Sequence, residues 1–501
     1  MMSESGRADT AGARDSVWSL ALVFGFGGAI AAWIVWFITD LPGVHIPANL
    51  ASMVIALPLA AAVFLAGRAA GNPGRGALSG LVAGTIAGIL GLLRFAAAVV
   101  FQPPAGAEPK PGVEGLHPES ASMIAAFLGG CAVLGLVFGA LGGVFGARRE
   151  AQRQDGQTTS TSSIEVVASS RRLFQFSVVT AVSFVPLILI GGLVTSTRAG
   201  MAVPGWPDSY GANMFLFPQS LMEDPRVFLE HIHRLFGSLI GLTVLVCTAW
   251  TFARERRGWI RGVATGVFAL VVVQGILGGL RVTEISPYLA WLHGVLGQVV
   301  FGSAVALAVF LSPLYAQGHR ELGTIAEPLP KRVRRARIFT NAFLHALFLQ
   351  LVMGAMYRHL RYAGNPGALH ALAFHVLFSF VVVVLGVMAA LGARAAIEAW
   401  KADRAQNPQA TLGERVLTVL SGAVLGVLFL QFLLGWFALW AVMTSPDKGG
   451  VPLHSELAEA PPIRTWEVLM RTSHQATGAM LLALATALML SYRRVLKLKK
   501  V

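Results

Sequence analysis

Four histidines within long apolar stretches are the residues of this sequence best suited to chemistry: His233, His293, His375 and His474. Each follows the start of its stretch by a few residues, which corresponds to roughly 5–13 Å along a helix at about 1.5 Å per residue. If alternate helices run in the same direction, all four imidazoles lie at one depth. A lone histidine of this kind often only joins two helices by a hydrogen bond. Four at matching depth indicate a shared ligand-binding role.

A small residue follows each of these histidines by four positions, at Gly237, Gly297, Ser379 and Gly478. Residues i and i+4 lie on the same helix face, so each imidazole has a nearly bare stretch of backbone beside it. Glycines also serve ordinary helix packing. Together with the histidines, however, they are expected to leave room for a flat macrocycle, and we assign the three glycines to cofactor binding.

The two halves of this histidine-rich region resemble each other. Residues 232–237 (Ile-His-Arg-Leu-Phe-Gly) match residues 374–379, residues 274–278 match 431–435, and residues 293–297 match 474–478. Repeats of four spans each keep the same direction in the membrane, as parallel repeats do. The sequence therefore predicts one site per half, with His233 beside His293 and His375 beside His474.

Two imidazoles in an apolar setting favour haem iron over zinc. Zinc takes four ligands, commonly with thiolates or carboxylates among them, whereas haem iron needs one or two axial ligands in an apolar bundle. The two cysteines, Cys131 and Cys247, lie in apolar stretches, and the sequence contains no Cys-x-x-Cys-His motif. We therefore expect non-covalently bound haem, with the four histidines as axial iron ligands.

Glu230 breaks the symmetry of the halves, because the matching residue in the second half is Leu372. A carboxylate near the apolar layer is costly and indicates function. One interpretation is an ion pair with Arg234, four residues later. The other is that Glu230 manages protons or charge at the haem edge, acting with His233 and His293. Since only one half has a carboxylate at this position, the two sites are expected to do different work.

The elements that position these residues are predicted to be membrane-spanning helices. Of 501 residues, 55% are apolar and 13% charged, with a mean hydropathy of +0.65; soluble proteins have about 45–50% and 25%. The composition indicates an all-α integral membrane protein. About twelve stretches are long enough to cross a bilayer: residues 17–38, 49–68, 77–101, 120–147, 173–195, 228–252, 263–282, 290–312, 337–356, 368–390, 416–442 and 466–491. The first follows a polar leader without a cleavage site and is expected to be an uncleaved span.

Lysine and arginine are concentrated in alternate connections, those on the same side as both termini. The positive-inside rule therefore places both termini in the cytoplasm of a multi-pass inner (plasma) membrane protein. This distribution accounts for the net charge of +14 without nucleic acid as a partner.

Six regions are predicted along the chain. They are a four-span region (1–150), a cytoplasmic linker (151–172), the first four-helix half (173–312), a second linker (313–336), the second half (337–491) and a basic tail (492–501). In the four-span region, glycines recur every four residues, as at Gly80, Gly84 and Gly88, which lets helix backbones approach closely. The region has no intramembrane histidine, and Arg94 is its one candidate for a buried charge. A packing or assembly module is expected, with transport as the alternative.

The histidine-rich region resembles haem A synthase. The motifs that carry the resemblance are residues 191–195 (Gly-Gly-Leu-Val-Thr), 205–207 (Gly-Trp-Pro), 230–234 (Glu-His-Ile-His-Arg), 277–279 (Leu-Gly-Gly) with His293, and 474–475 (His-Gln). The resemblance covers about residues 173–491. It implies an eight-helix bundle of two four-helix halves and oxidation of the C8 methyl group of haem O to a formyl group, which yields haem A for cytochrome oxidase.

The resemblance also implies roles for the two sites. The first half would bind the substrate haem with His233 and His293 beside Glu230, and the second half would hold a haem b with His375 and His474. The implied partners are haem O, an electron donor, haem O synthase and cytochrome oxidase subunits.

Three departures from the family stand out within this region. Val376 follows His375 where an arginine is usual, and His370 is a rival ligand five residues earlier. The stretch 203–209 lacks the cysteine pair that many bacterial members carry. The four-span region at 1–150 lies outside the family pattern.

Two mechanisms stay open, because iron bound by both His233 and His293 has no free position for oxygen. Either one ligand leaves during turnover, or the methyl group is oxidised by electron removal and addition of water. In the second case Glu230 would stabilise the positive charge that develops at the methyl carbon.

Two other functions compete with the synthase: a di-haem b-type cytochrome that takes electrons from quinol, and a transporter, which would need charges near the membrane midplane. Of the remaining histidines, His231 is expected to face away from His233, and His345 and His359 to make interface contacts. His45, His117, His319 and His454 are expected in solvated loops. The connection 443–465 would cover the second site or be solvated.

Overall fold

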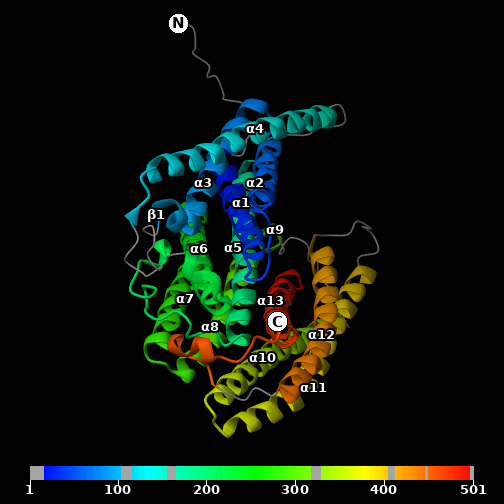
Figure 1. The fold of residues 1–501 in the computed structure, drawn as a ribbon. Helices are drawn as coiled ribbons and strands as arrows, with labels where there is room; N and C mark the ends of the chain where they lie inside the picture. Colours follow the sequence, from blue (N-terminus) through cyan, green and yellow to red (C-terminus); the bar gives the residue numbers. More distant parts are fainter. Residues whose placement is uncertain are drawn as a thin grey trace. The chain divides into compact units, whose positions relative to one another are not determined.

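The computed structural model describes residues 16–102, 115–154, 165–217, 219–317, 329–403, 412–445 and 450–496. Within these ranges, twelve helices are long and apolar enough to cross a membrane. This confirms the predicted all-α integral membrane protein (Figure 1). The described strands form one antiparallel pair, β1 (Phe101–Gln102) and β2 (Gly115–Leu116).

The first four long helices are α1 (Val17–Thr39), α2 (Ala48–Ala70), α3 (Pro73–Val100) and α4 (Ser120–Gln154). The following helices are α5 (Glu165–Ser196), α6 (Pro225–Arg254), α7 (Gly258–Thr283), α8 (Pro287–Leu311), the short α9 (Pro313–Gln317), α10 (Leu329–Tyr362), α11 (Gly367–Asp403), α12 (Leu412–Thr444) and α13 (Thr465–Val495). Three 3-10 turns, η1 (Met214–Leu216), η2 (Gln219–Glu223) and η3 (His454–Glu459), lie in the connections.

The chain forms two compact units. Unit 1 comprises Met1–Phe95, Pro118–Val179 and Ala253–Arg256, and unit 2 comprises Ala96–His117, Thr180–Phe252 and Arg257–Val501. All four predicted ligand histidines lie in unit 2.

Glycines bring the helices of unit 1 together backbone to backbone, as their spacing predicts. A Cβ atom on Gly80 of α3 would meet the carbonyl of Gly135 on α4, and one on Gly139 would meet the carbonyl of Gly76. Such contacts allow close packing in lipid, where dispersion rather than water exclusion holds helices together. Arg94 is buried in this unit, and its guanidinium carbon lies 3.4 Å from the centroid of the Phe95 ring.

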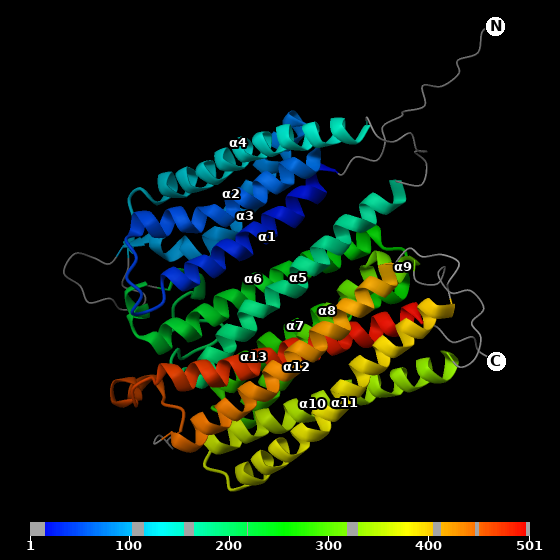
Figure 2. The ribbon, with the colours of Figure 1, turned by 90° about the vertical axis from the view of Figure 1, so that its right-hand side faces the viewer.

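Unit 2 is a bundle in which α7 packs on α8, α10 on α11 and α12 on α13, while α8, α10 and α13 contact one another. Figure 2 shows α10, α11, α12 and α13 running side by side. A buried apolar cluster that includes Phe343, Leu417 and Leu481 lies among the later helices. The end at which α6, α8, α11 and α13 begin is called the histidine end below.

Several helices extend beyond the apolar stretches. Helix α10 begins at Leu329 rather than at 337, and α11 continues to Asp403 rather than to 390. The predicted linker 151–172 is helical at both ends, while residues 155–164 lie outside the described residues. Hydropathy predicts only the apolar part of a helix, which lipid or other helices cover. Charged turns continue a helix because its backbone groups stay paired there.

Candidate functional site

The structure brings the four histidines together in the two predicted pairs. The ring centroids of His233 and His293 are 6.4 Å apart, and those of His375 and His474 are 6.2 Å apart. The histidines lie six to nine residues after the first residues of α8, α6, α11 and α13, about 9–14 Å along each helix at about 1.5 Å per residue. Both pairs therefore lie near the histidine end of unit 2.

The spacing within each pair fits two axial ligands of one iron. A metal–imidazole bond is about 2.0 Å long, and a ring nitrogen lies about 1.2 Å from the ring centroid, given ring bonds of about 1.3–1.4 Å. Two imidazoles on opposite sides of one iron thus have centroids about 6.4 Å apart. Among the described residues, no group of three or more His, Cys, Asp or Glu side chains could hold a metal ion. A pair of imidazoles suits haem iron, whose other ligands come from the porphyrin.

A glycine on the preceding helix faces each imidazole. A Cβ atom would lie 3.0 Å from the ring atom Cε1 at Gly191 and Gly278, 2.7 Å at Gly354 and 3.2 Å at Gly435. The sequence motifs include three of these glycines, but their part in seating the rings becomes clear only from the helix pairing. Because the same contact recurs at all four histidines, the two halves repeat in structure as well as in sequence.

The glycines one turn after the histidines have different surroundings from those predicted. Nothing lies within 4 Å of a Cβ atom placed on Gly237, so this position is open. A Cβ atom placed on Gly297 would lie 2.9 Å from the side-chain nitrogen of Gln274. A Cβ atom placed on Gly478 would lie 3.0 Å from the side-chain nitrogen of Gln431. Two of the three predicted clearances therefore accommodate glutamine side chains.

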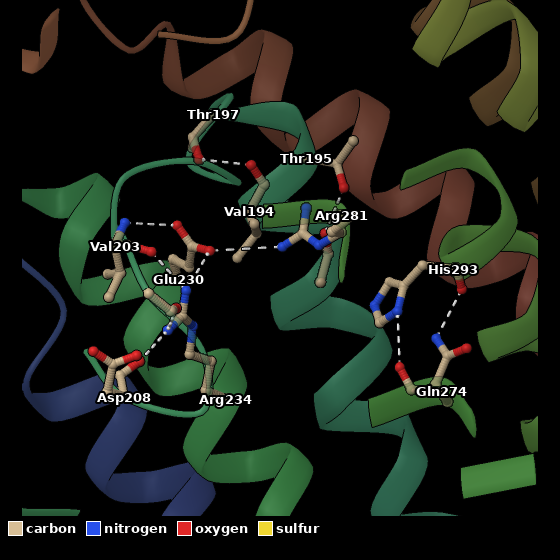
Figure 3. Close-up of polar contacts among 12 residues, drawn as sticks. Val194, Thr195, Thr197, Val203, Asp208, Glu230, Arg234, Gln274, Arg281 and His293 are labelled. Atoms are coloured by element: carbon tan, nitrogen blue, oxygen red, sulfur yellow. Dashed lines mark hydrogen bonds and ion pairs between the residues drawn. The ribbon is translucent and has the colours of Figure 1, made fainter. Parts of the chain in front are cut away.

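Glutamine side chains also fasten two of the ligand helices. The side-chain amide of Gln274 donates to the backbone carbonyl of His293 at 2.7 Å, and the backbone carbonyl of Gln274 lies 3.1 Å from Nδ1 of the same histidine (Figure 3). Gln350 makes the same two contacts with His375, at 2.8 and 2.9 Å. An Nδ1–H that donates to a carbonyl leaves Nε2 as the atom with a free lone pair, which is the form that ligates a metal.

Glu230 is 1% exposed and lies in a cluster of polar groups (Figure 3). Its carboxylate accepts from the backbone N–H of Val203 at 2.9 Å and pairs with Arg234 at 3.2 Å, as the sequence suggests, and with Arg281 of α7 at 3.7 Å. The carboxylate is thus balanced by two cations, one from its own helix and one from α7.

Arg234 and Glu230 together hold the connection that follows α5. The guanidinium of Arg234 donates to the backbone carbonyls of Val203, Gly205 and Asp208, at 2.6, 2.9 and 3.0 Å. In the same connection, the Tyr210 hydroxyl donates to the carbonyl of Ala202 at 2.7 Å. Burial, then the charges of Glu230 and Asp224, raise the pKa of Tyr210 above its ordinary value, so it remains a donor. The stretch 203–209, which contains no cysteine, is therefore fixed by hydrogen bonds.

A cavity of about 260 Å³ opens beside the second histidine pair. It is lined by His375 and His474, by the glutamines and glycines that face them, and by apolar side chains of α11 and α12. Three arginines, Arg358, Arg361 and Arg471, also line it. The cavity therefore combines an apolar body with imidazoles and a cationic region.

Glu467 is a buried carboxylate that the sequence predictions missed. It is 4% exposed and pairs with Arg471 at 3.0 Å and with Arg464 at 3.5 Å. Leu372 remains the counterpart of Glu230, so the position of the carboxylate, rather than its presence, distinguishes the halves. The spacing of Glu467 four residues before Arg471, which in turn precedes His474 by three, was the available signal.

The remaining histidines divide into exposed and packed ones. His375 faces His474, whereas its rival His370 is exposed. His231 packs on Phe217 with 4.6 Å between ring centroids, on a face other than that of the histidine pair. His359 lines the second cavity. Other positions follow: His345 bonds to the carbonyl of Asn341, His45 and His454 are exposed, His117 is partly exposed, and His319 lies outside the described residues.

The connection after α12 is anchored where it is described. Arg198 donates to the carbonyl of Gly450 at 3.2 Å, and Arg226 donates to the carbonyl of Pro461. Asp447 and Lys448 lie outside the described residues. The described part is thus tied to the first half through Arg198 and Arg226.

These features define a polytopic membrane protein with two pairs of facing histidines. The comparisons with known proteins concern the part of the chain that holds the first pair. Residues 174–365 match the model of the cytochrome oxidase assembly protein family. This range contains Glu230, His233 and His293 but ends before His375 and His474. The match and the relatives below confirm the resemblance to haem A synthases for this part of the chain.

Several haem A synthases are similar to the chain at low identity. That of Lysinibacillus sphaericus is 27% identical over 195 residues, which are 38% of this chain and 59% of the relative. That of Exiguobacterium sibiricum is 27% identical over 155 residues (30% and 50%), and that of Shouchella clausii 28% over 138 residues (27% and 44%). The chain thus spans between 44% and 59% of the length of these relatives. No solved structure matches the chain.

Proposed function

We propose that this protein is a haem A synthase-like membrane oxidoreductase that converts the C8 methyl group of haem O to a formyl group. The observation that carries the proposal is the first histidine pair, at the spacing of two axial ligands, beside a buried carboxylate in the segment that matches the cytochrome oxidase assembly family. Haem A formed in this way would serve the assembly of cytochrome oxidase.

In this proposal His233 and His293 hold haem O as the substrate, and its iron supplies redox chemistry when bound. Gly191 and Gly278 seat the two rings, and the 203–208 connection limits access of water at the histidine end. Conversion of the methyl group to a formyl group takes up one oxygen atom and removes electrons, so an electron acceptor or dioxygen is required. If one ligand were released, dioxygen could serve as the oxidant, with water as the second product. If water supplied the oxygen atom, a separate acceptor would have to take up four electrons, and four protons would be released.

Glu230 is proposed to serve as a fixed countercharge and as an anchor for the 203–208 connection. It neutralises part of the charge of Arg234 and Arg281. Without this carboxylate, the two arginines together would oppose positive charge that develops at the haem edge. Removing one partner of such a buried pair leaves a costly unpaired charge.

The second pair, His375 and His474, is proposed to hold a haem b that transfers electrons. The cavity beside this pair has cationic side chains, and arginines bind carboxylates such as haem propionates with paired hydrogen bonds. Arg358, Arg361 and Arg471 are the candidates for that contact.

The protein is proposed to lie in the plasma membrane with both termini in the cytoplasm, which places the histidine end on the outside. The proposed partners are an electron donor, haem O synthase and cytochrome oxidase subunits. The four-span region at 1–150 is proposed to be a packing or assembly module, and the region boundaries given by the sequence remain part of the proposal.

The proposal is tested by extracting haem from membranes that express the chain, with and without a supply of haem O, and separating haems B, O and A. Haem A is expected only with haem O. It is expected to disappear in the His233→Ala and His293→Ala variants. The presence of haem B alone under haem O supply would contradict the synthase and favour the di-haem cytochrome.

A further inference from the structure

Each ligand histidine packs against the helix that precedes its own in the chain. In three cases out of four, that preceding helix carries a glutamine followed four residues later by the glycine that faces the ring. A glutamine precedes the ring-facing glycine by one turn at Gln274 and Gly278, Gln350 and Gly354, and Gln431 and Gly435. In α5, which faces His233 through Gly191, the corresponding residue is Leu187. The first site thus has a glutamine on one side, and the second site has one on both.

The glutamine ties two helices together and thereby fixes the imidazole. Where both bonds form, at Gln274 and Gln350, the side chain holds the backbone of the histidine while the glutamine carbonyl accepts from Nδ1. Hydrogen bonds of this kind to a ligating histidine set its tautomer and orientation and strengthen its bond to the metal. At both of these glutamines, the bond from the side-chain amide and the bond from the ring occur together.

His233 lacks all of these supports. Its Nδ1 atom is buried and has no hydrogen-bond partner among the described residues. The space beside Gly237, one turn deeper on its own helix, is open, whereas glutamine amides face the corresponding Gly297 and Gly478. Nδ1 of His474 also lacks such a bond, but Gln431 lies next to it and faces Gly478.

We infer that His293, positioned by Gln274, is the permanent ligand of the first site and that His233 is its exchangeable ligand. This inference rests on the proposed haem ligation. It provides the first site with an iron position that opens at His233, which has neither a glutamine nor an Nδ1 bond. The second site, with Gln350 bonded to His375 and Gln431 packed at Gly478, is inferred to stay closed to added ligands. Leu187 is then the residue that makes the first site labile.

The test uses the purified, haem-loaded full-length protein. Carbon monoxide binding is measured on the reduced protein, and the high-spin fraction is measured on the oxidised protein by electron paramagnetic resonance. In the wild-type protein, one of two haems is expected to bind carbon monoxide. Leu187→Gln, which adds the missing amide, is expected to slow that binding at least about tenfold and to lower the high-spin fraction. Leu187→Met, of similar length without an amide, is the matched control and is expected to leave both unchanged.

Two further variants test the permanent ligand. Gln274→Met is expected to speed haem loss from the first site, and His233→Ala to retain haem there while His293→Ala loses it. The inference is overturned if Leu187→Gln behaves as Leu187→Met does. It is also overturned if His233→Ala, rather than His293→Ala, loses the haem. In both cases haem ligation by the pair still holds. Absence of haem from the first site in every protein would overturn both the inference and the proposed function.

Discussion

At the residue scale, Glu230 links the first histidine pair to the 203–208 connection that follows α5. One carboxylate oxygen pairs with Arg234 and Arg281, and the other accepts from the backbone of Val203. A glutamine would keep an acceptor for Val203 but would remove the charge that the two arginines share. The substitution therefore separates the electrostatic role of this residue from its anchoring role.

We predict that Glu230→Gln lowers haem A formation about 100-fold, the usual effect of removing a preorganised electrostatic group, while haem remains bound at the first site. Product is measured by haem extraction, and binding by absorbance of the purified protein. Glu467→Gln, which alters the carboxylate beside the second cavity, is the control and should leave haem binding at the first site unchanged. Undiminished haem A formation in Glu230→Gln would remove Glu230 from the mechanism.

Some of the site's residues could be predicted and others could not, depending on their separation along the chain. The Glu230–Arg234 contact follows from helical periodicity, and the histidine pairs follow from their matching depth and from the repeat of the two halves. The Arg281 contact joins α7 to α6, and no periodicity predicts it. Two of the glutamines belong to a sequence motif that is repeated in the two halves. The bonds of Gln274 and Gln350 to the histidine backbone could not be predicted, because those bonds depend on which helices lie side by side.

At the element scale, close approach of helices at a glycine determines whether an imidazole can keep its position. A methyl group on Gly278 would lie 3.0 Å from Cε1 of His293, which is closer than side chains pack without moving. Overpacking of this kind typically costs about 1–3 kcal/mol.

We predict that Gly278→Ala lowers haem occupancy of the first site several-fold, measured as Soret absorbance per protein. Gly266→Ala is the control in the same helix, because nothing lies within 4 Å of its added methyl group. Alanine also favours helix over glycine, so the control should fold at least as well as the wild-type protein. Equal occupancy in the two variants would show that the glycine contact does not position the ring.

The spans could be predicted from the sequence more completely than the helix ends. All twelve helices coincide with apolar stretches because the bilayer requires about twenty apolar residues per crossing. The ends of α10 and α11 lie in charged segments, where helical hydrogen bonding continues without any hydropathy signal.

At the scale of the whole molecule, the proposed orientation in the membrane rests on the distribution of lysine and arginine alone. The positive-inside rule predicts the histidine end outside. Ser455, between α12 and α13, and Gly258, the first residue of α7, are both exposed. The proposed topology places them on opposite sides of the membrane.

We predict that a membrane-impermeant maleimide labels Ser455→Cys in intact cells and labels Gly258→Cys only after the cells are opened. The native thiols Cys131 and Cys247, both within spans, provide the background signal in the unsubstituted protein. The reverse labelling pattern would invert the topology and place the histidine end in the cytoplasm.

The central claim is that unit 2 holds two haems, each between two histidines, and it is tested most directly by haem stoichiometry combined with electron paramagnetic resonance of the purified protein. Two haems per chain are expected when haem supply is sufficient. The His375→Ala, His474→Ala double variant should lose one haem together with a bis-imidazole low-spin signal, and the His233→Ala, His293→Ala double variant should lose the other. Unchanged haem content in either double variant would contradict the assignment of that pair.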